Sequence, residues 1–181
     1  MNRGFTLIET LVAITVLVTA VAGVLKIAGD SLRLTAVARE QLVAFYLAQE
    51  PIEFIRNVRD SNRLQTPPDP WLTHLSECIS TDGTTRCVID ATESKYPPLP
   101  NTIRTCPILP TPCEILDIQT STKLYGYGNG ALWVPTKFTR TTAIITPMGG
   151  NADEMRIDVT VSWQVGLVQR SVTIQEYLLN W

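Results

Sequence analysis

Apolar and polar residues divide the chain into a continuous apolar run, a stretch with helical periodicity and a C-terminal part with strand-like alternation. The apolar run extends from Phe5 to Leu25, and Glu9 is its one charged residue. At about 1.5 Å of rise per residue, a helix over this run spans about 30 Å, which matches the hydrocarbon core of a bilayer. Because charge and polarity rise at Asp30 and Ser31, the pattern predicts a membrane-spanning helix over residues 5–30.

Beyond residue 30, apolar residues recur at three- and four-residue steps, as they do on one face of a helix. This stripe consists of Ala38, Leu42, Phe45, Ala48, Ile52, Ile55 and Val58. The other face carries Arg39, Glu40, Gln49, Glu50, Glu53, Arg56 and Arg59. We therefore expect one nearly continuous helix from about Phe5 to about Asp60, with a kink near Leu47 to Pro51 because proline lacks a backbone donor.

The C-terminal third predicts an antiparallel sheet. Residues 155–163 alternate strictly between apolar and polar side chains, which is the period of a half-buried strand. A turn at residues 164–167 leads to a returning strand from Val168, and residues 138–146 supply a preceding strand. The expected fold class is α+β: a long N-terminal helix packed on a C-terminal antiparallel sheet. We expect Ile52, Ile55 and Val58 beneath Val159, Val161 and Trp163.

The middle of the chain is rich in Pro, Thr and Ser and gives weaker signals. Residues 62–101 contain two proline-rich breakers, and residues 78–90 suit an irregular hairpin that turns at Asp82-Gly83. The connection at 147–151 also reads as a turn. Gly126, Gly128 and Gly130 stand among aromatic residues without a following helix start, which favours an aromatic loop packed over the sheet rather than a phosphate site.

The chain holds four cysteines: Cys78, Cys87, Cys106 and Cys113. Three pairings into two disulfides are possible. We favour the local pairing Cys78–Cys87 with Cys106–Cys113, in which each disulfide closes a loop that lacks strong secondary structure. Free thiols remain an alternative. A metal site is disfavoured because the close spacing of zinc ligands is absent.

Composition narrows the function. The net charge is −2, so there is no global electrostatic case for nucleic-acid binding. His74 is the only histidine and no nucleophile motif flanks it, so it suits a surface or packed position better than catalysis. We therefore expect no enzyme activity, no cofactor and no metal site.

The N-terminal residues Arg3-Gly4-Phe5-Thr6-Leu7-Ile8-Glu9 resemble the class III leader of type IV pilins and type II secretion pseudopilins. The resemblance implies that a prepilin peptidase cleaves after Gly4 and that the new N-terminal amine of Phe5 is methylated. It also implies that Glu9 pairs with the N-terminal amine of a neighbouring subunit. Without the resemblance, Glu9 would simply lie at the level of the lipid headgroups.

Two other parts of the chain resemble pilin-like proteins of small-genome uncultivated bacteria. They are residues 48–62 and the strand pieces 159–163 and 173–178. In those proteins a glycine commonly stands where this chain has Pro51. Many type IV pilins also carry a proline about where Lys26 stands, so its absence predicts a straighter membrane helix here.

These observations predict three parts: a leader at 1–4, a membrane and assembly helix at 5–30, and an exported globular domain at 31–181 that includes the amphipathic half-helix 31–60. The expected function is a structural subunit, a minor pilin or pseudopilin, of a type IV pilus-like or type II secretion filament. Its partners would be the membrane, other pilin subunits, the prepilin peptidase and an assembly platform. Its location would be a single-pass position in the cytoplasmic membrane, then an extracellular or periplasmic filament. The alternative is a membrane-anchored surface binding domain that never polymerises.

Overall fold

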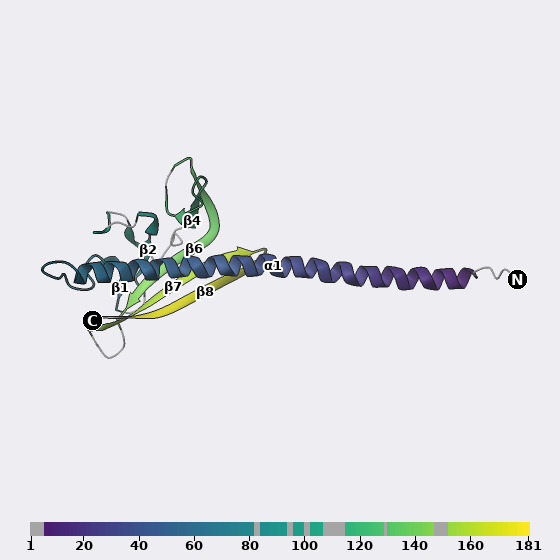
Figure 1. The fold of residues 1–181 in the computed structure, drawn as a ribbon, viewed down its shortest axis with the longest axis horizontal. Helices are drawn as coiled ribbons and strands as arrows, with labels where there is room; N and C mark the ends of the chain where they lie inside the picture. Colours follow the sequence, from purple (N-terminus) through teal and green to yellow (C-terminus); the bar gives the residue numbers. More distant parts are fainter. Residues whose placement is uncertain are drawn as a thin grey trace. The chain divides into compact units, whose positions relative to one another are not determined.

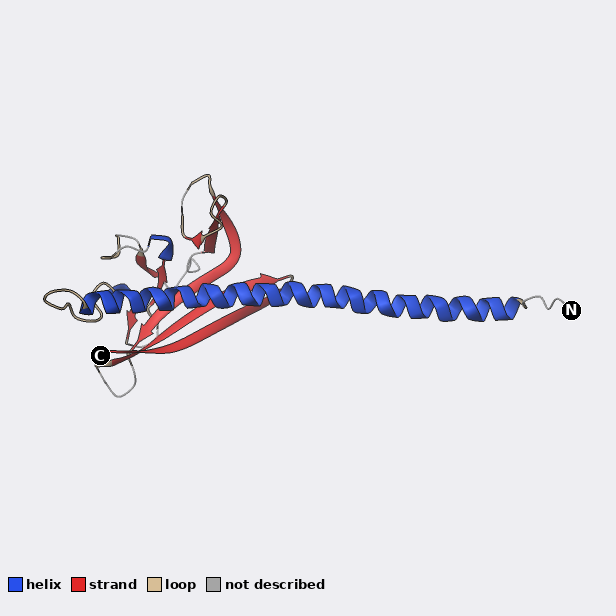
Figure 2. Ribbon diagram, in the orientation of Figure 1, coloured by secondary structure: helices blue, strands red, loops and turns tan. Residues whose placement is uncertain are grey.

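The computed structural model describes residues 6–81, 84–93, 96–99, 102–106, 115–128, 130–146 and 152–181. Within these residues the chain forms one long helix, eight strands and two short 3-10 helices (Figure 2). Their bounds are α1 Leu7–Arg63, η1 Ser76–Cys78, β1 Ile79–Ser80, β2 Arg86–Ile89, η2 Ala91–Glu93, β3 Ile103–Cys106, β4 Ile115–Gln119, β5 Tyr125–Gly126, β6 Trp133–Ile145, β7 Glu154–Val165 and β8 Val168–Leu179. The predicted α+β class is confirmed.

The chain divides into two compact units, Met1–Glu40 and Gln41–Trp181, and we call the second the globular unit. The helix α1 contributes to both units because it continues from Leu7 to Arg63. Pro51 lies inside α1 and does not end it. The long helix expected from the sequence is therefore confirmed, whereas the kink expected near Pro51 remains a prediction.

The strand β6 is the centre of the sheet (Figure 1). On one side β6, β7 and β8 form the predicted antiparallel meander, and Gly166 closes the β7–β8 turn at a φ of 61°. On its other side β6 pairs antiparallel with β2 and β4 and parallel with β1. The strands β3 and β5 extend the sheet beyond β2 and β4. The sheet is thus larger than the three strands that alternation revealed.

The core of the globular unit lies between the second half of α1 and the sheet. Ile52, Ile55 and Val58 are buried in one apolar cluster with residues of β7. The β7 members include the three predicted ones, Val159, Val161 and Trp163. Complete burial of a large apolar side chain contributes about 1.5–3 kcal/mol, so this cluster supplies the main stabilisation of the helix against the sheet. The strand register predicted from alternation is confirmed.

The first half of the predicted stripe is wrong. Leu42 and Phe45 are exposed, while Ala44 and Leu47 are buried. At about 100° per residue, Leu42 lies about 160° around the helix from Ala44 and therefore faces away from the sheet. The predicted polar face is also wrong at one position, because Arg59 was expected to be exposed there but is buried.

The predicted hairpin over residues 78–90 is also wrong. The two-residue strand β1 pairs with β6, whereas β2 pairs with β3 and β6. An isolated hairpin this short is not stable in water, because it lacks a third strand or a covering layer. The long β6 provides both segments with a partner instead. The turns expected at Asp82-Gly83 and at 147–151 lie outside the described residues.

Asn62, in the last turn of α1, holds the loop that follows the helix. Its side chain is fully buried and donates hydrogen bonds to the carbonyls of Trp71 and Thr73 at 3.1 and 2.8 Å. Its Oδ1 accepts a hydrogen bond from the Tyr96 hydroxyl at 2.9 Å. One amide side chain therefore bonds three polar groups from two chain segments, the loop after α1 and the segment at Tyr96.

Candidate functional site

Thr6 forms the N-cap of α1. Its Oγ1 accepts a hydrogen bond from the backbone N–H of Glu9 at 3.3 Å. Its carbonyl accepts bonds from the N–H groups of Glu9 and Thr10 at 3.1 and 3.2 Å. A threonine N-cap with a glutamate three residues later is the sequence pattern of a capping box. The spacing of Thr6 and Glu9 displays this pattern in the sequence, and sequence reasoning missed it.

Glu9 is exposed in the first turn of α1, where the helix dipole favours negative charge. This favourable interaction is worth about 0.3–1 kcal/mol. It offsets only part of the few kcal/mol that a carboxylate near a membrane helix end requires. A cationic partner would therefore still stabilise this residue. The other predicted processing residues, Gly4 and Phe5, lie outside the described residues.

The apolar part of α1 has side chains that no other described residue of its own unit covers. The large apolar residues from Leu7 to Ile27 are exposed, with fractions from 51 % at Val21 to 82 % at Leu7. Among the described residues, α1 is the one helix long and apolar enough to cross a membrane by length and composition. Such a surface is favourable in lipid or against other apolar helices, and unfavourable in water.

The hydroxyl groups in this apolar stretch are satisfied within the helix. Thr10 donates to the carbonyl of Leu7 at 2.8 Å, and Thr15 donates to that of Val12 at the same distance. Thr19 donates to the carbonyls of Thr15 and Val16, both at 3.0 Å. Because no hydroxyl requires water, these threonines are compatible with hydrocarbon.

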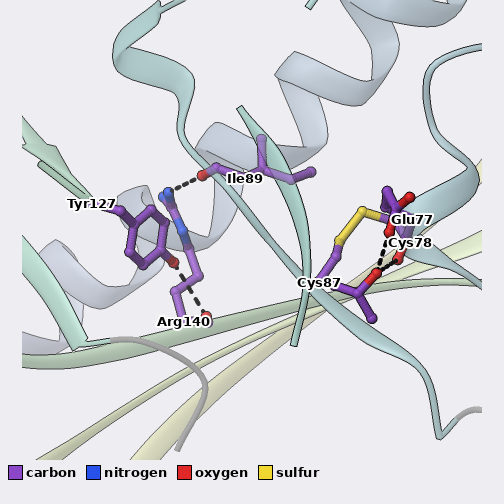
Figure 3. Close-up of a disulfide and its surroundings, with 7 residues drawn as sticks. Glu77, Cys78, Cys87, Ile89, Tyr127 and Arg140 are labelled. Atoms are coloured by element: carbon purple, nitrogen blue, oxygen red, sulfur yellow. Dashed lines mark hydrogen bonds between the residues drawn. A yellow bond between two sulfur atoms is a disulfide. The ribbon is translucent and has the colours of Figure 1, made fainter. Parts of the chain in front are cut away.

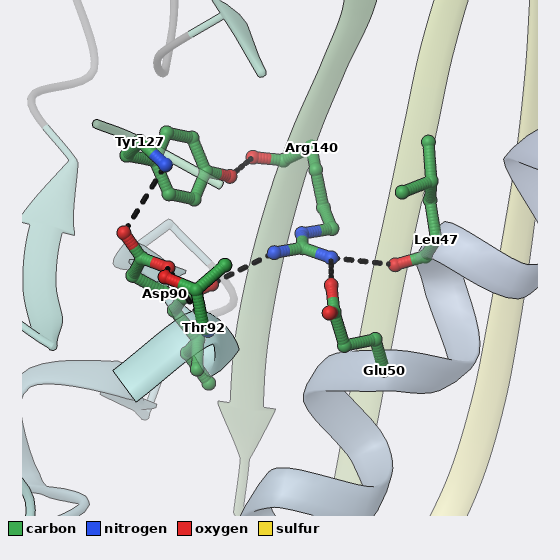
Figure 4. Close-up of polar contacts among 7 residues, drawn as sticks. Leu47, Glu50, Asp90, Thr92, Tyr127 and Arg140 are labelled. Carbon is green, nitrogen blue, oxygen red and sulfur yellow. Dashed lines mark hydrogen bonds and ion pairs between the residues drawn. The ribbon is translucent and has the colours of Figure 1, made fainter. Parts of the chain in front are cut away.

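In the globular unit, Arg140 of β6 is a buried charge that joins three elements (Figure 4). Its Nη1 donates to the Leu47 carbonyl of α1 at 2.9 Å and pairs with the Glu50 carboxylate. Its Nη2 donates to the carbonyl of Ile89, at the end of β2, at 2.8 Å. The Tyr127 hydroxyl donates to the Arg140 carbonyl at 3.3 Å.

The contact with Leu47 explains how α1 tolerates Pro51. In an α-helix the N–H of residue 51 would bond to the carbonyl of residue 47, and proline has no N–H. Arg140 supplies the missing donor from the sheet. Burial by itself would lower the pKa of Arg140, but Tyr127 and Glu50 raise the pKa above its ordinary value, so the guanidinium stays charged.

Sequence reasoning missed Arg140, although a signal was present. Arg140 shares the inward period-two positions of β6 with Phe138 and Ile144, which are buried. An arginine at such a position requires buried acceptors. Pro51 pointed to one of them, because it leaves a helix carbonyl without its donor.

The predicted aromatic loop packs on the sheet. A Cβ added to Gly128 would lie 2.0 Å from Trp133, and the indole therefore occupies the space that a side chain would fill. Asp90 holds the same segment, since its Oδ2 accepts a hydrogen bond from the Tyr127 N–H at 3.1 Å (Figure 4). The glycine at position 128 is thus required by close approach of an aromatic ring.

Cys78 and Cys87 form a disulfide, the local pairing favoured for these two residues (Figure 3). Both are fully buried in the core cluster, and not in a loop that buries little apolar surface as expected. Cys106 also belongs to a disulfide. Its predicted partner Cys113 lies outside the described residues, so that pairing remains a prediction. None of the described cysteines is free.

Other candidate chemistry is sparse in the part of the chain that the structure describes. No group of three or more His, Cys, Asp or Glu side chains there could hold a metal ion. His74 is exposed, adopts a φ of 68° and places its ring edge-on to Tyr96 at 5.8 Å. A positive φ of this size is typical of a residue in a turn.

Comparison with known protein families gives a match for the N-terminal segment. Residues 1–25 match the family described as the prokaryotic N-terminal methylation motif. No curated protein and no solved structure matches the chain. The motif covers the apolar start of α1, including Thr6 and Glu9. With this motif and a long apolar N-terminal helix, the chain fits the type IV pilin-like family.

Proposed function

We propose that this chain is a structural subunit, a minor pilin or pseudopilin, of a type IV pilus-like or type II secretion filament. The observation that carries the proposal is the methylation motif at residues 1–25, which coincides with an exposed apolar helix that has one acid in its first turn. A plain membrane anchor requires neither the motif nor Glu9.

The proposed assembly step exchanges one apolar environment for another. Before assembly, the apolar half of α1 lies in lipid. In the filament, it packs against the same half of other subunits, so apolar burial is retained. Glu9 gains a cationic partner, the free amine of Phe5 on a neighbouring subunit. Glu9 destabilises the subunit in the membrane, but the charge pair that forms only between subunits stabilises it in the filament.

The proposal assigns a place to each part of the chain. Residues 1–4 are a leader removed by a prepilin peptidase, residues 5–30 cross the cytoplasmic membrane, and residues 31–181 are exported. An assembly platform then transfers the subunit into an extracellular or periplasmic filament. In this role the chain has structural partners and no enzyme activity, cofactor or nucleic-acid ligand.

Processing provides the first test. Gly4→Val should leave the full-length precursor in the membrane, because the larger side chain blocks a peptidase pocket that accepts glycine. Gly23→Ala is a matched control, since an added Cβ there meets nothing within 4 Å. Intact-mass spectrometry of the wild-type chain from membranes or filaments should give a methylated chain that starts at Phe5. A filament subunit that retains Met1 would refute the processing step.

Assembly provides the second test. Glu9→Leu should remain in the membrane and be depleted from sheared filaments, because its ion-pair partner is lost. Thr6→Ala is the matched control, since it removes the helix cap at a cost of about 1 kcal/mol and keeps the carboxylate. Equal depletion of both variants would assign Glu9 to capping. Wild-type incorporation of Glu9→Leu, or a processed chain found only in membranes, would favour the anchored surface domain instead.

A further inference from the structure

The strand β8 has one edge that no other described strand covers. Among the described strands it pairs with β7 alone, through an unbroken register from Val168 opposite Val165 to Leu179 opposite Glu154. Figure 1 shows β8 as the yellow strand at the margin of the sheet. It is 12 residues long, and its outer N–H and C=O groups form a template for another strand, apart from the Leu179 carbonyl, which accepts a hydrogen bond from Arg59.

Three of the devices that often protect such an edge are missing from β8. It contains no proline and no lysine, and its pairing with β7 has no bulge. Its two charged residues, Arg170 and Glu176, have opposite signs. Val172 and Ile174 pack against the core and remain half-buried at this edge. The edge is therefore open to a partner of suitable pattern.

The sequence of β8 is complementary to itself. In an antiparallel pair of two β8 strands centred on Thr173, Arg170 of each copy stands opposite Glu176 of the other. In the same register Val172 stands opposite Ile174, and Val168 stands opposite Leu178, so the remaining inward pairs are apolar with apolar. Opposite charges and apolar pairs at directly facing positions stabilise adjacent strands.

Other registers lose this match. A shift by two residues in either direction places Arg170 opposite an apolar residue, Ile174 or Leu178. A shift by one residue sets each inward side chain opposite an outward one. Charge and apolar pairs are therefore all satisfied in the register centred on Thr173.

We infer that two copies of this chain pair through their β8 edges, with a two-fold axis at Thr173, into one continuous sheet. The occupant of each edge is the β8 strand of a second copy. Glu176 contacts Arg56 of its own copy and would accept Arg170 from the partner as a second cation. This pairing concerns the globular unit and does not depend on incorporation into a filament.

Site-directed cross-linking of the full chain in detergent micelles tests the pairing. In the proposed dimer the two Thr173 Cβ atoms face each other, about 5 Å apart. Gln175 instead faces position 171 of the other copy, so the two Gln175 side chains are separated by four residues, about 13 Å along the strand. Thr173→Cys should give a covalent dimer on mild oxidation. Gln175→Cys, which also lies on the outward face and also loses one hydrogen bond, is the matched control.

Charge reversal provides the second arm. Added to Thr173→Cys, Arg170→Glu should reduce the dimer about tenfold, since two opposite-charge pairs become two like-charge pairs. Lys123→Glu makes the same change of charge in the β4–β5 turn and should leave the yield unchanged. Circular dichroism checks that Arg170→Glu, a substitution at an exposed position, leaves the fold intact. If the fold is lost, Arg170→Gln is used in place of Arg170→Glu.

The outcomes are distinct. A peptide joined from position 173 to position 173, found by mass spectrometry, supports the inference. Equal yields from the two cysteine variants, no dimer from Thr173→Cys, or a Thr173→Cys adduct with a different protein would overturn it. Because dimerisation through the apolar helix would not distinguish positions 173 and 175, the test does not depend on the proposed filament role.

Discussion

At the scale of single residues, Arg140 shows how a charge can be buried in this fold without being left unpaired. It is 1 % exposed, and its Nη1 and Nη2 groups reach a helix carbonyl, a carboxylate and a strand carbonyl. Breaking such a buried ion pair by removal of one partner is strongly destabilising, because the remaining groups stay desolvated. The residue therefore links the position of α1 to that of the sheet.

We expect Arg140→Met to lower the free energy of unfolding of the full chain by about 3–5 kcal/mol. Pro51→Ala should then compensate in part, because the new N–H at position 51 can bond to the Leu47 carbonyl that lost its donor. A double-mutant cycle by urea unfolding should give a favourable coupling of about 1 kcal/mol. If the two effects simply add, Arg140 does not act as the donor that replaces proline's missing N–H.

Asp117 of β4 provides a pH prediction. Burial raises the pKa of its carboxyl above the ordinary value. The folded chain therefore binds this proton more tightly than the unfolded chain, and the contribution to stability is present below the unfolded pKa of about 3.9 and lost as the pH rises through the folded pKa. Asp117→Asn should stabilise the chain at pH 7 by less than about 1 kcal/mol, since the side chain is partly exposed. The difference should vanish near pH 3; equal differences at both pH values would contradict the burial argument.

At the scale of elements, the sheet is organised around β6. The amphipathic part of α1 covers the inward positions of β6 and β7, while β1, β2 and β4 depend on β6 for pairing. The disulfide lies at this junction, because Cys87 faces Thr142 of β6 and Cys78 ends the 3-10 helix before β1. It therefore belongs to the core of the globular unit.

Removal of this disulfide should weaken the whole globular unit. Closure of a loop of this length contributes about 3 kcal/mol in the chain-entropy treatment, and the sulfur atoms are fully buried. We expect Cys78→Ala with Cys87→Ala to cost about 3–5 kcal/mol by urea unfolding of the full chain. Hydrogen exchange should show reduced protection in β6 as well as β2. Loss of protection confined to residues 79–89 would show that the disulfide closes only its own loop.

At the scale of the whole molecule, the two compact units have opposite surface requirements. The first exposes a continuous apolar surface, whereas the second has its own buried core and hydrogen-bond network. The second unit should therefore be stable without the first, since the apolar stretch contributes no residue to that core.

A chain truncated to begin at Ser31 should be soluble and should unfold in one cooperative transition. Tryptophan fluorescence and far-ultraviolet circular dichroism should report the same urea midpoint, because Trp163 and the helix–sheet contact belong to one core. The full chain in micelles is the reference. Separate midpoints for the two signals would mean that the helix and the sheet of the globular unit do not fold together.

Sequence alone determined the features that depend on local periodicity and on a contiguous motif. The apolar run, the helical stripe around Ile52 and Ile55, the alternation of β7 and the motif that begins the chain are all readable because each signal lies within a few turns or one strand. The helical period of 3.6 residues and the strand period of 2.0 residues indicate which side chains share a face, and so which face is buried, without knowledge of distant contacts.

Tertiary structure decided the features that depend on which distant segments meet. Leu42 lies outside and Ala44 inside because the sheet covers one side of α1, and β2 joins β6 and β3 because a short hairpin cannot hold itself together. The guanidinium of Arg140 is held by the carbonyl of Leu47, 93 positions earlier in the chain, and only the folded structure brings the two together. Local patterns specify which face of an element is apolar, but a buried polar group is stable only beside its particular partner, and the packing of the chain selects that partner.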